Sequence, residues 1–539
     1  LRFNQVSSDA LVVGAEHLSK TPYYSDFGLH EFFEFCELCN IEPLMVMPIS
    51  LPDKNDDVES LSEFLDYCLG DESTFWGRKR MNNGRVAPFN LKYLEIGNEQ
   101  FNQVMPAPGS LRFVEGSDLL WTRENTLHYV DKLTKMAILA KNKYPIIKIG
   151  AVGANDFLTQ NSYLNLVIDS VWDSLVILNC AKYIDFICPH DYATGPTEAS
   201  NFLGLMSASE NFKKIHQHSQ KLIKDSENPN MKVLITEFAV NDDFNKDIQV
   251  NFRFKSSLYF ALMQIQYQKM GLLGSCLYNL KDDAYFGLID QKYWESGHMN
   301  RKVMKSSGFW ALKLFNNLSF DQIINSETDS PTFHSPPMGW MPEVSKSPYV
   351  NVLATINFNQ DSLALILVNT DTINDFECSI ALNPFKMEGN QMMSKALLNS
   401  NSSMTLNSYS EPDLIEIIEE SVESFSEDTV NLNLPPLSMM GLKFKVSKDL
   451  NSFNESFKEV KPEMLIHPNP FDKFLKVEIP NKARKEQFEF QIFSALGSIV
   501  VEGKMAENKI ISTNQLSPGV YILKVYNQQR VFVKKVFKN

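Results

Sequence analysis

Basic charge and long hydrophobic runs are both scarce in this sequence. Its 51 Lys and Arg residues are outnumbered by 65 Asp and Glu residues, which gives a formal net charge of −14 at pH 7. A general nucleic-acid-binding protein needs basic surface to neutralise phosphates, so this balance argues against that class. No apolar run reaches the roughly 18–20 residues that a membrane-spanning helix needs, so we expect no membrane span.

Cysteines and glycine-rich motifs are also few. The seven cysteines are odd in number and scattered from Cys36 to Cys378, which is no disulfide framework. Cys36 and Cys39 form a CxxC pair, but the pair lies in a helical pattern and no second CxxC accompanies it. We therefore interpret both as buried helix-face thiols and not as metal ligands. Neither GxGxxG nor GxxxxGK[ST] occurs, and we predict no metal and no cofactor.

The chain is too long for a single core, and its pattern changes along the 539 residues. In residues 1–330, short apolar segments alternate with helical patterns, as in parallel βαβ units. In residues 331–448, short strands separated by turn residues predict an antiparallel β-sandwich. Residues 449–463 predict a linker. Residues 464–539 predict a small all-β module, and from Asp472 onward twelve basic residues stand against six acidic ones in an otherwise acidic chain.

Six strands are clear in the first segment, each followed by a helical pattern. A doubly wound open sheet and an eight-stranded barrel both fit this count, but polar residues at the ends of several strands favour the barrel. A (β/α)8 TIM-type barrel needs two more strands, so we expect an N-terminally incomplete barrel whose first and last clear strands flank a gap, partly filled by residues 1–25. The six strands are "LMVMPI", "KYLEI", "IKIGAVGA", "YIDFICPHDY", "KVLITEF" and "LLGSCLYNL".

Two glutamates stand at strand ends. Glu99 follows the strand of "KYLEIGNEQFN", and Glu237 ends "KVLITEF". Because parallel strands of a barrel open on one face, these carboxylates can converge on a bound substrate, and paired carboxylates suit glycoside hydrolysis. Asn98 can hydrogen-bond a sugar hydroxyl, while His190 and Tyr192 can orient a carboxylate. Glu95, inside its strand, is expected to face the barrel interior, and we assign it no chemistry.

Three stretches resemble glycoside hydrolase family 51, the α-L-arabinofuranosidases: "FGLHEFFEFCELCNIEPLMVMPI", "STFWGRKRMNNGRVAPFNLKYLEIGNE" and "ITEFAV". The resemblance implies a retaining mechanism on a (β/α)8 barrel with an attached β-sandwich. It also implies that Glu99 is the acid/base and Glu237 the nucleophile. Asn98, His190 and Tyr192 match the family's substrate-binding positions.

The tail has its own resemblance, in "HPNPFDKFLKVEIP", "FSALGSIV" and "LSPGVYILKVYNQQRVFVKKVFKN". These stretches resemble the C-terminal sorting domain of the type IX secretion system, which implies that secretion machinery as a partner and a secreted or cell-surface location. A small carbohydrate-binding module is the alternative, but none of the six Trp residues lies beyond Trp340.

The expected function is release of L-arabinofuranosyl residues from plant cell-wall polysaccharides such as arabinan and arabinoxylan. An endo-acting glucanase or xylanase on the same barrel is one alternative. A non-catalytic sugar-binding remnant is the other, because both glutamates argue for activity while the missing strands argue against it. Linkage preference, chain-length preference and oligomeric state have no signal in the sequence.

Overall fold

The computed structural model forms two compact units, Leu1–Lys448 and Asp449–Asn539. Each is described by itself below. In the first unit the structure describes residues 27–49, 57–100, 118–154, 163–193, 201–240, 249–281, 286–290, 303–338, 341–383, 385–420 and 429–448. In the second it describes residues 465–467, 471, 473–478, 488–494, 499–505, 510–527 and 531–538.

A parallel sheet forms the core of the first unit. Its strand order is β1-β2-β3-β4-β6-β5, with β7 also paired to β6, and every pairing is parallel. All six predicted strand segments are present, and the fourth is divided in two at Pro189, which has no N–H for a strand ladder. The strands are β1 (Leu44–Met47), β2 (Tyr93–Ile96), β3 (Lys148–Val152), β4 (Phe186–Cys188), β5 (His190–Tyr192), β6 (Lys232–Ala239) and β7 (Gly274–Leu277).

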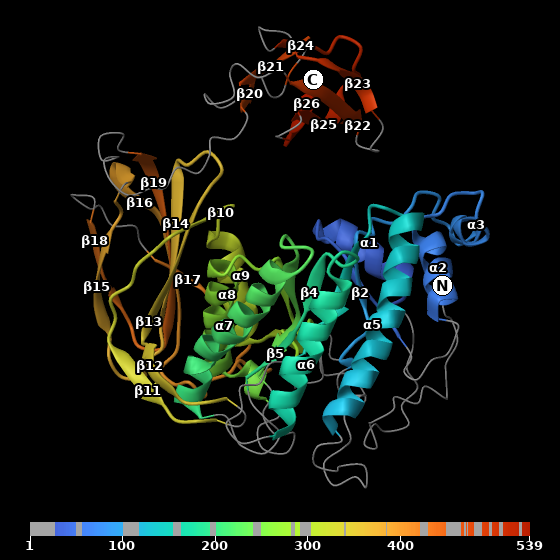
Figure 1. Cartoon of the computed structure of the whole chain (residues 1–539). Coiled ribbons are helices and arrows are strands. Elements are labelled where there is room, and N and C mark those ends of the chain that lie inside the picture. Colours follow the sequence, from blue (N-terminus) through green and yellow to red (C-terminus); the bar gives the residue numbers. More distant parts are fainter. Residues whose placement is uncertain are drawn as a thin grey trace. The chain divides into compact units, whose positions relative to one another are not determined.

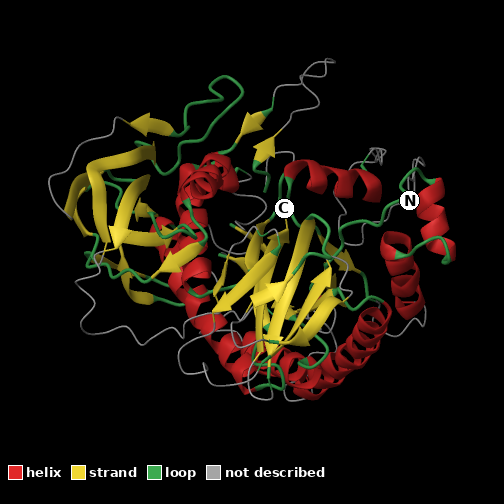
Figure 2. Ribbon diagram, turned by 90° about the horizontal axis from the view of Figure 1, so that it is seen from above, coloured by secondary structure: helices red, strands yellow, loops and turns green. Residues whose placement is uncertain are grey.

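Helices follow the strands and form an arc along one face of this sheet (Figure 1, Figure 2). Several begin at a residue whose side chain accepts a hydrogen bond from the first turn: Thr74 for α3, Asn201 for α7 and Ser306 for α9. The helices are α1 (Leu29–Cys39), α2 (Asp57–Leu69), α3 (Phe75–Asn82), α5 (Asp118–Lys143), α6 (Tyr163–Cys180), α7 (Phe202–Asp225), the 3-10 turn η1 (Val250–Phe252), α8 (Phe254–Lys269) and α9 (Ser307–Leu318).

The two faces of the parallel sheet have different surroundings. Residues such as Leu94, Ile149 and Ile235 belong to the large core shared with the helices. On the other face a smaller cluster is built around Phe186 and Leu234. This alternation follows from the two-residue period of a strand. The described strands therefore form a half-barrel with helices outside and a smaller inner cluster.

The half-barrel has two open edges within the described residues. β1 pairs only with β2, and β7 pairs only with β6. Val46 on β1 is 46% exposed, and Cys276 on β7 is exposed. Within the described ranges, the first and last predicted strands thus each pair on one side alone, and the gap between them stays a prediction. The prediction that residues 1–25 partly fill it concerns positions outside the described residues.

One prediction about the cysteines is wrong. Cys36 is buried, as expected, but Cys39 is exposed. Cys39 is the last residue of α1, and Asn40 follows in the left-handed conformation with φ 52°. The helix ends there because this conformation terminates the helical hydrogen bonding, and the final turn lies at the surface and not against the core.

An antiparallel sheet of six strands packs on the helices α8 and α9. Its order is β10-β13-β14-β19-β16-β17. Gly441 on β19 permits a close approach, since a Cβ there would overlap the side chain of Leu318 on α9. The strands are β10 (Gln322–Ile324), β13 (Val350–Ile356), β14 (Ser362–Asn369), β16 (Phe385–Asn399), β17 (Ile418–Glu420) and β19 (Ser438–Lys448).

The other face of this sheet lies against the antiparallel pair of strands β15 (Phe376–Ala381) and β18 (Thr429–Leu434). Leu365 and Leu442 of the six-stranded sheet share a core with Val430 and Leu434 of the pair. β10 precedes residue 331 but pairs with β13, so the antiparallel segment begins earlier than the change of sequence pattern indicates. The shorter strands of this unit are β8 (Ile289–Asp290), β9 (Met304–Lys305), β11 (Thr332–Ser335), β12 (Val344–Pro348), β15 (Phe376–Ala381) and β18 (Thr429–Leu434).

The second unit is all-β within its described residues. It holds a three-stranded sheet, β20-β21-β24, and a four-stranded sheet, β23-β22-β25-β26. Its own core includes Leu475, Ile492 and Leu523. The strands are β20 (Leu465–His467), β21 (Phe474–Glu478), β22 (Glu489–Ser494), β23 (Ile499–Lys504), β24 (Ile510–Ser512), β25 (Gly519–Tyr526) and β26 (Val531–Lys538).

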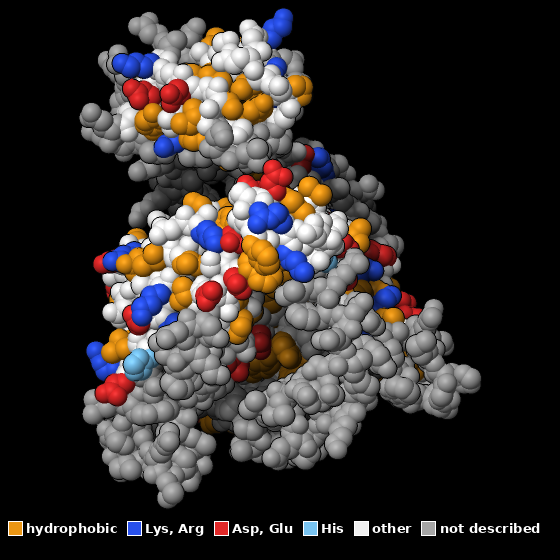
Figure 3. Space-filling view, turned by 90° about the vertical axis from the view of Figure 1, so that its right-hand side faces the viewer, with side chains coloured by type: hydrophobic (Ala, Val, Ile, Leu, Met, Phe, Trp, Pro, Cys, Tyr) orange, Lys and Arg blue, Asp and Glu red, His pale blue; other side chains and the backbone are white. Residues whose placement is uncertain are grey.

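The face shown in Figure 3 carries both signs of charge. In the view of Figure 3, acidic and basic side chains are interspersed with apolar ones. None of the helices in the described ranges combines the length and apolar character that crossing a membrane requires.

Candidate functional site

A tight turn after β2 presents Glu99. Gly97 has φ 99°, and a Cβ there would overlap the side chain of Gln100, so glycine is needed at this position. The buried Gln100 accepts a hydrogen bond from the backbone N–H of Asn98 and donates one to the carbonyl of Ile49 at 3.4 Å. Glu99 itself has φ 53°, an uncommon conformation for a residue with a side chain. The turn thus holds Glu99 in a specific direction, and Asn98 beside it is exposed.

A β-bulge in β6 presents Glu237. Ile187 of β4 pairs with Val233 of β6, and His190 of β5 pairs with Glu237 of β6. From the first pair to the second, the chain moves four residues along β6 but only three along β4 and β5. The pairing with β7 also shifts between Ile235 and Phe238. One extra residue therefore lies in β6 close to Glu237. A bulge changes the direction of the side chains at its position, and such bulges often lie next to active sites.

His190 and Tyr192 connect the two carboxylates. Nδ1 of His190 lies 2.9 Å from Oε1 of Glu99 and 3.4 Å from Oε2 of Glu237. The hydroxyl of Tyr192 donates to Oε2 of Glu237 at 2.6 Å. Both side chains come from β5, where residues two apart point to the same face. The structure therefore brings together Glu99, Glu237, His190 and Tyr192 at the carboxyl ends of β2, β5 and β6.

Burial and charge act against each other in this group. Burial raises the pKa of Glu237 above its ordinary value, while the charge of His190 and the hydrogen bond from Tyr192 oppose that rise. Burial lowers the pKa of His190, but the hydrogen bond with Glu99 and the nearby carboxylates outweigh it, so the net shift is upward. The pKa of Tyr192 is raised, first by burial and then by Glu237, so this hydroxyl keeps its proton and acts as a donor.

A third carboxyl group lies behind the site. Glu95 on β2 is 1% exposed, and its Oε1 has no hydrogen-bond partner among the described residues. Burial raises the pKa of Glu95 to about 7, against the opposing charge of His190. Glu95 is thus buried, as expected of a residue that faces the barrel interior.

Two aromatic residues near Tyr192 were not identified from the sequence. The ring of Phe286 contacts the ring of Tyr192, with centroids 6.0 Å apart. The ring of Phe286 also contacts the ring of Tyr278, with centroids 5.3 Å apart. Tyr278 is 39% exposed. Phe286 lies outside the predicted strands, so no strand-end pattern marks it. Phe286 thus connects the ring of Tyr278 to that of Tyr192, whose hydroxyl contacts Glu237.

The same cluster has the composition of a cation site. Ligand atoms of Glu99, His190 and Glu237 lie within 4.8 Å of one another. These atoms also hydrogen-bond with each other and with Tyr192. We therefore interpret the cluster as a coupled carboxylate pair, and we assign it no metal.

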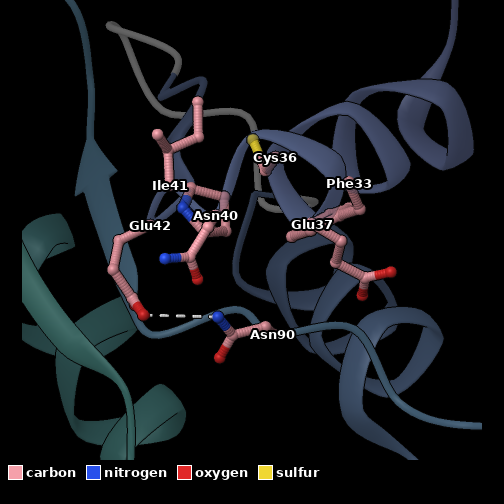
Figure 4. A pocket seen from close by; sticks show the side chains of 8 residues that line it. Phe33, Cys36, Glu37, Asn40, Ile41, Glu42 and Asn90 are labelled. Atoms are coloured by element: carbon pink, nitrogen blue, oxygen red, sulfur yellow. Dashed lines mark hydrogen bonds between the residues drawn. The ribbon is translucent and has the colours of Figure 1, made fainter.

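A separate cavity of about 200 Å³ lies where α1 leads into β1 (Figure 4). Its two acidic residues have partners: Glu37 pairs with Arg85 at 2.5 Å, and Glu42 with Lys92 at 2.8 Å. The cavity lies at the amino end of β1, whereas Glu99 and Glu237 follow the carboxyl ends of their strands. It is therefore not part of the candidate site.

Replacing Tyr192 by Phe is expected to move the acidic limb of the kcat/KM profile to higher pH. The hydroxyl favours the ionised form of Glu237, so its loss raises the pKa of that carboxyl further. Since a hydrogen bond to a charged group contributes about 1.5–3 kcal/mol, we expect kcat/KM at acidic pH to fall roughly 10- to 100-fold. A pH profile measures this.

Tyr144→Phe is the matched control for that variant. It removes the 2.7 Å hydrogen bond that the Tyr144 hydroxyl donates to the carboxylate of Asp66 on α2. Neither residue belongs to the candidate site. Its profile should equal that of the unmodified chain. An unchanged profile in Tyr192→Phe would show that Tyr192 does not control Glu237.

Two family models match the chain. The model described as "Alpha-L-arabinofuranosidase 1 domain" matches residues 12–202. The model described as "Secretion system C-terminal sorting domain" matches residues 465–539. The first match includes Glu99, His190 and Tyr192, and the second covers the described strands of the second unit.

Curated relatives and solved structures agree with the first model. A probable α-L-arabinofuranosidase C of Aspergillus fumigatus is 22% identical over 367 residues, which are 65% of this chain and 66% of that protein. The α-L-arabinofuranosidase C of Emericella nidulans is 32% identical over 75 residues, 14% of each chain. The chain thus spans just under two thirds of the first relative and a much smaller share of the second.

Among solved structures, the α-L-arabinofuranosidase of Thermotoga maritima in complex with arabinose has a TM-score of 0.63 at 20% identity. The similarity covers 78% of this chain and 79% of that one. The family 51 α-L-arabinofuranosidase of Thermotoga petrophila has a TM-score of 0.62 at 19% identity, over 77% of this chain and 78% of that one. At these identities the structures show a shared fold. The chain is therefore similar to α-L-arabinofuranosidases over much of its first unit, and residues 465–539 match the model of a secretion-system C-terminal sorting domain.

Proposed function

We propose that the chain is a retaining glycoside hydrolase that releases L-arabinofuranosyl residues from arabinan or arabinoxylan. The observation that carries this proposal is the approach of Glu99 and Glu237: one carboxylate oxygen of each lies within 4.8 Å of the other, and both carboxylates contact Nδ1 of His190. Retaining glycosidases have carboxyl groups about 5–5.5 Å apart, whereas inverting ones need about 6.5–9.5 Å to admit a water. The matched domain supports the choice of arabinofuranosides as substrates.

In this proposal Glu237 is the nucleophile and Glu99 the acid/base. Glu99 gives its proton to the glycosidic oxygen while Glu237 attacks the anomeric carbon, so the C–O bond to the leaving group breaks as the bond to Glu237 forms. Glu99 then takes a proton from a water molecule, which attacks the same carbon and releases the sugar and Glu237. The Tyr192 hydroxyl, 2.6 Å from Glu237, stabilises the negative charge on that carboxylate before attack and after release.

Asn98, His190 and Tyr192 are proposed to bind the sugar. Asn98 is exposed next to Glu99, so its amide is free to reach a hydroxyl group of the substrate. His190 contacts both carboxylates and Tyr192 contacts Glu237, so both side chains lie beside the position that the anomeric carbon takes in this proposal. The comparisons do not favour the two alternatives, an endo-acting glucanase or xylanase and a non-catalytic remnant.

An assay of the whole chain tests the proposal. We expect hydrolysis of p-nitrophenyl α-L-arabinofuranoside and release of arabinose from arabinan, with no cleavage of β-glucan or of internal xylan bonds. Proton NMR of the first product formed should show the α-anomer, because two displacements restore the configuration. Release of the β-anomer would contradict the retaining mechanism, and cleavage of β-glucan would support the endo-acting alternative.

We further propose a domain arrangement. The catalytic part is a (β/α)8-type barrel that extends to about residue 320, since β10 pairs with the following sheet. A β-sandwich extends to residue 448, and the linker predicted for residues 449–463 lies outside the described residues. Residues 464–539 form the sorting module, which directs the chain to the surface or the medium by a type IX secretion machinery.

Deleting residues 449–539 is expected to abolish export and leave catalysis unchanged. The second unit has its own core and supplies none of the residues of the candidate site. Export is measured by the share of chain found in the medium or at the cell surface, and catalysis by kcat/KM of the purified protein. Loss of activity on deletion, with unfolding of the first unit, would show that the module is structural.

A further inference from the structure

Asp191 lies between His190 and Tyr192 on β5, yet it points away from the site. Successive side chains on a strand face opposite sides, so Asp191 enters the layer of helices while its neighbours reach the carboxylates. It is 1% exposed. A carboxyl group buried to this degree is costly unless it is hydrogen-bonded, and the catalytic steps above do not use it.

Side chains from two helices hold this carboxyl group. Nε2 of His216 on α7 lies 2.7 Å from Oδ2 of Asp191. The hydroxyl of Tyr267 on α8 donates to the same oxygen at 2.7 Å. The hydroxyl of Tyr259, also on α8, lies 3.4 Å from the backbone carbonyl of Asp191. The centre of β5 is therefore tied to both helices that pack behind it.

The protons in this network have clear positions. Burial and the charge of Asp191 raise the pKa of Tyr267, so its hydroxyl stays protonated and donates. Nδ1 of His216 is buried and has no hydrogen-bond partner among the described residues. The network therefore assigns the ring hydrogen to Nε2, which donates to Asp191. Oδ2 thus accepts two hydrogen bonds.

β5 needs such an anchor because its backbone is weakly held. The strand has only three residues and is separated from β4 by Pro189. Within the described residues it pairs with β6 alone, beside the bulge at Glu237. A short strand with one neighbour, next to an irregular pairing, has few backbone hydrogen bonds to fix its rotation. Side-chain contacts must supply the rest.

We propose that Asp191, held by His216 and Tyr267, is a positioning residue that sets the rotation of β5, so that His190 reaches Glu99 and Tyr192 reaches Glu237. A rotation that moves Asp191 away from the helices also withdraws both neighbours from the carboxylates, because the three side chains share one short strand. This inference rests on the proposed function, in which those carboxylates are the acid/base and the nucleophile.

The kinetic test compares Asp191→Asn and Tyr267→Phe with the unmodified chain. A misplacement of about 1 Å can cost roughly 100-fold in rate, so we expect kcat of Asp191→Asn to fall by that order while KM changes little. Tyr267→Phe loses one of the two hydrogen bonds and should lose about tenfold in kcat. In both, the acidic limb of kcat/KM should move to higher pH, because Tyr192 holds Glu237 less well.

Tyr67→Phe is the matched control. Tyr67 is 3% exposed, and its hydroxyl lies 2.6 Å from Nε2 of the buried His30, so Tyr67→Phe removes a buried tyrosine hydrogen bond as Tyr267→Phe does. It should lower Tm and leave kcat and the pH profile unchanged. If Asp191→Asn and Tyr267→Phe behave in this same way, Asp191 serves stability alone and the proposal is overturned.

A crystal structure of Asp191→Ala tests the positioning without any assay. The contact between His190 and Glu99, 2.9 Å in the unmodified chain, should lengthen beyond 3.5 Å. If that contact stays at its length in Asp191→Ala, the positioning proposal is wrong, whatever the activity of the variant. If the unmodified chain hydrolyses no arabinofuranoside, the proposed function fails while this distance still decides the positioning. Tyr267→Phe replaces Asp191→Ala in the crystal if the latter does not fold.

Discussion

Glu237→Ala is expected to lower kcat on p-nitrophenyl α-L-arabinofuranoside by at least about 10⁴-fold, as loss of a covalent nucleophile does in other hydrolases. The variant keeps Glu99 but offers no atom to attack the anomeric carbon. Glu237 is the residue of β6 whose carboxylate contacts His190 and Tyr192. The loss is measured by comparing kcat of Glu237→Ala with kcat of the unmodified chain at saturating substrate.

Azide distinguishes loss of the nucleophile from loss of folding. It can enter the space left by the carboxylate and attack once, which restores turnover and gives the β-configured, inverted glycosyl azide. Glu42→Ala is a suitable control, because Glu42 lies at the amino end of β1 and pairs with Lys92. It should keep full activity. An α-configured azide from Glu237→Ala would show that Glu237 is not the nucleophile.

Glu99→Ala is expected to lower kcat/KM by about 10²–10⁴-fold on natural arabinans, whose leaving groups need a proton. With a dinitrophenyl leaving group the first step needs no such proton, so kcat/KM should change little. Deglycosylation then becomes slow, and KM falls as the glycosyl-enzyme accumulates. Rates across a series of aryl arabinofuranosides measure this dependence on the leaving group.

With Glu99→Ala, azide should give a glycosyl azide of the opposite anomeric configuration from the one that Glu237→Ala gives. It attacks the glycosyl-enzyme formed on Glu237, so two inversions yield the α-configured azide. The basic limb of the pH profile should also disappear, because that limb reports the proton of the acid. Equal losses on activated and natural substrates would mean that Glu99 does not act as an acid.

Much of the parallel sheet could be predicted from the sequence. Short apolar segments between amphipathic helices allow few arrangements other than parallel βαβ units, and all six such segments form strands. Helix starts were less well predicted. The start of α7 at Phe202 was not predicted, although Asn201 was available as a cap. Apolar periodicity identifies the buried face of a helix better than its first turn.

The residues of the candidate site were also predicted only in part. Glu99, Glu237, His190 and Tyr192 were predicted because each ends or follows a strand, and strand ends of a parallel sheet share one edge. Asp191 was passed over because a strand-end pattern does not show which face a residue occupies. Phe286 was missed since it lies outside the predicted strands, and its contact with Tyr192 depends on the fold.

The sequence by itself determined the order of elements, the change from parallel to antiparallel structure and the chemical types at the strand ends. These features depend on local patterns: apolar period, turn residues and the restriction that Pro189 places on its strand. Only the tertiary structure decided which carboxylates meet. The extra residue in β6 turns Glu237 toward His190, and the left-handed turn at Glu99 brings the second carboxylate to the same imidazole. Both effects depend on pairings between residues distant in the chain, which no local pattern records.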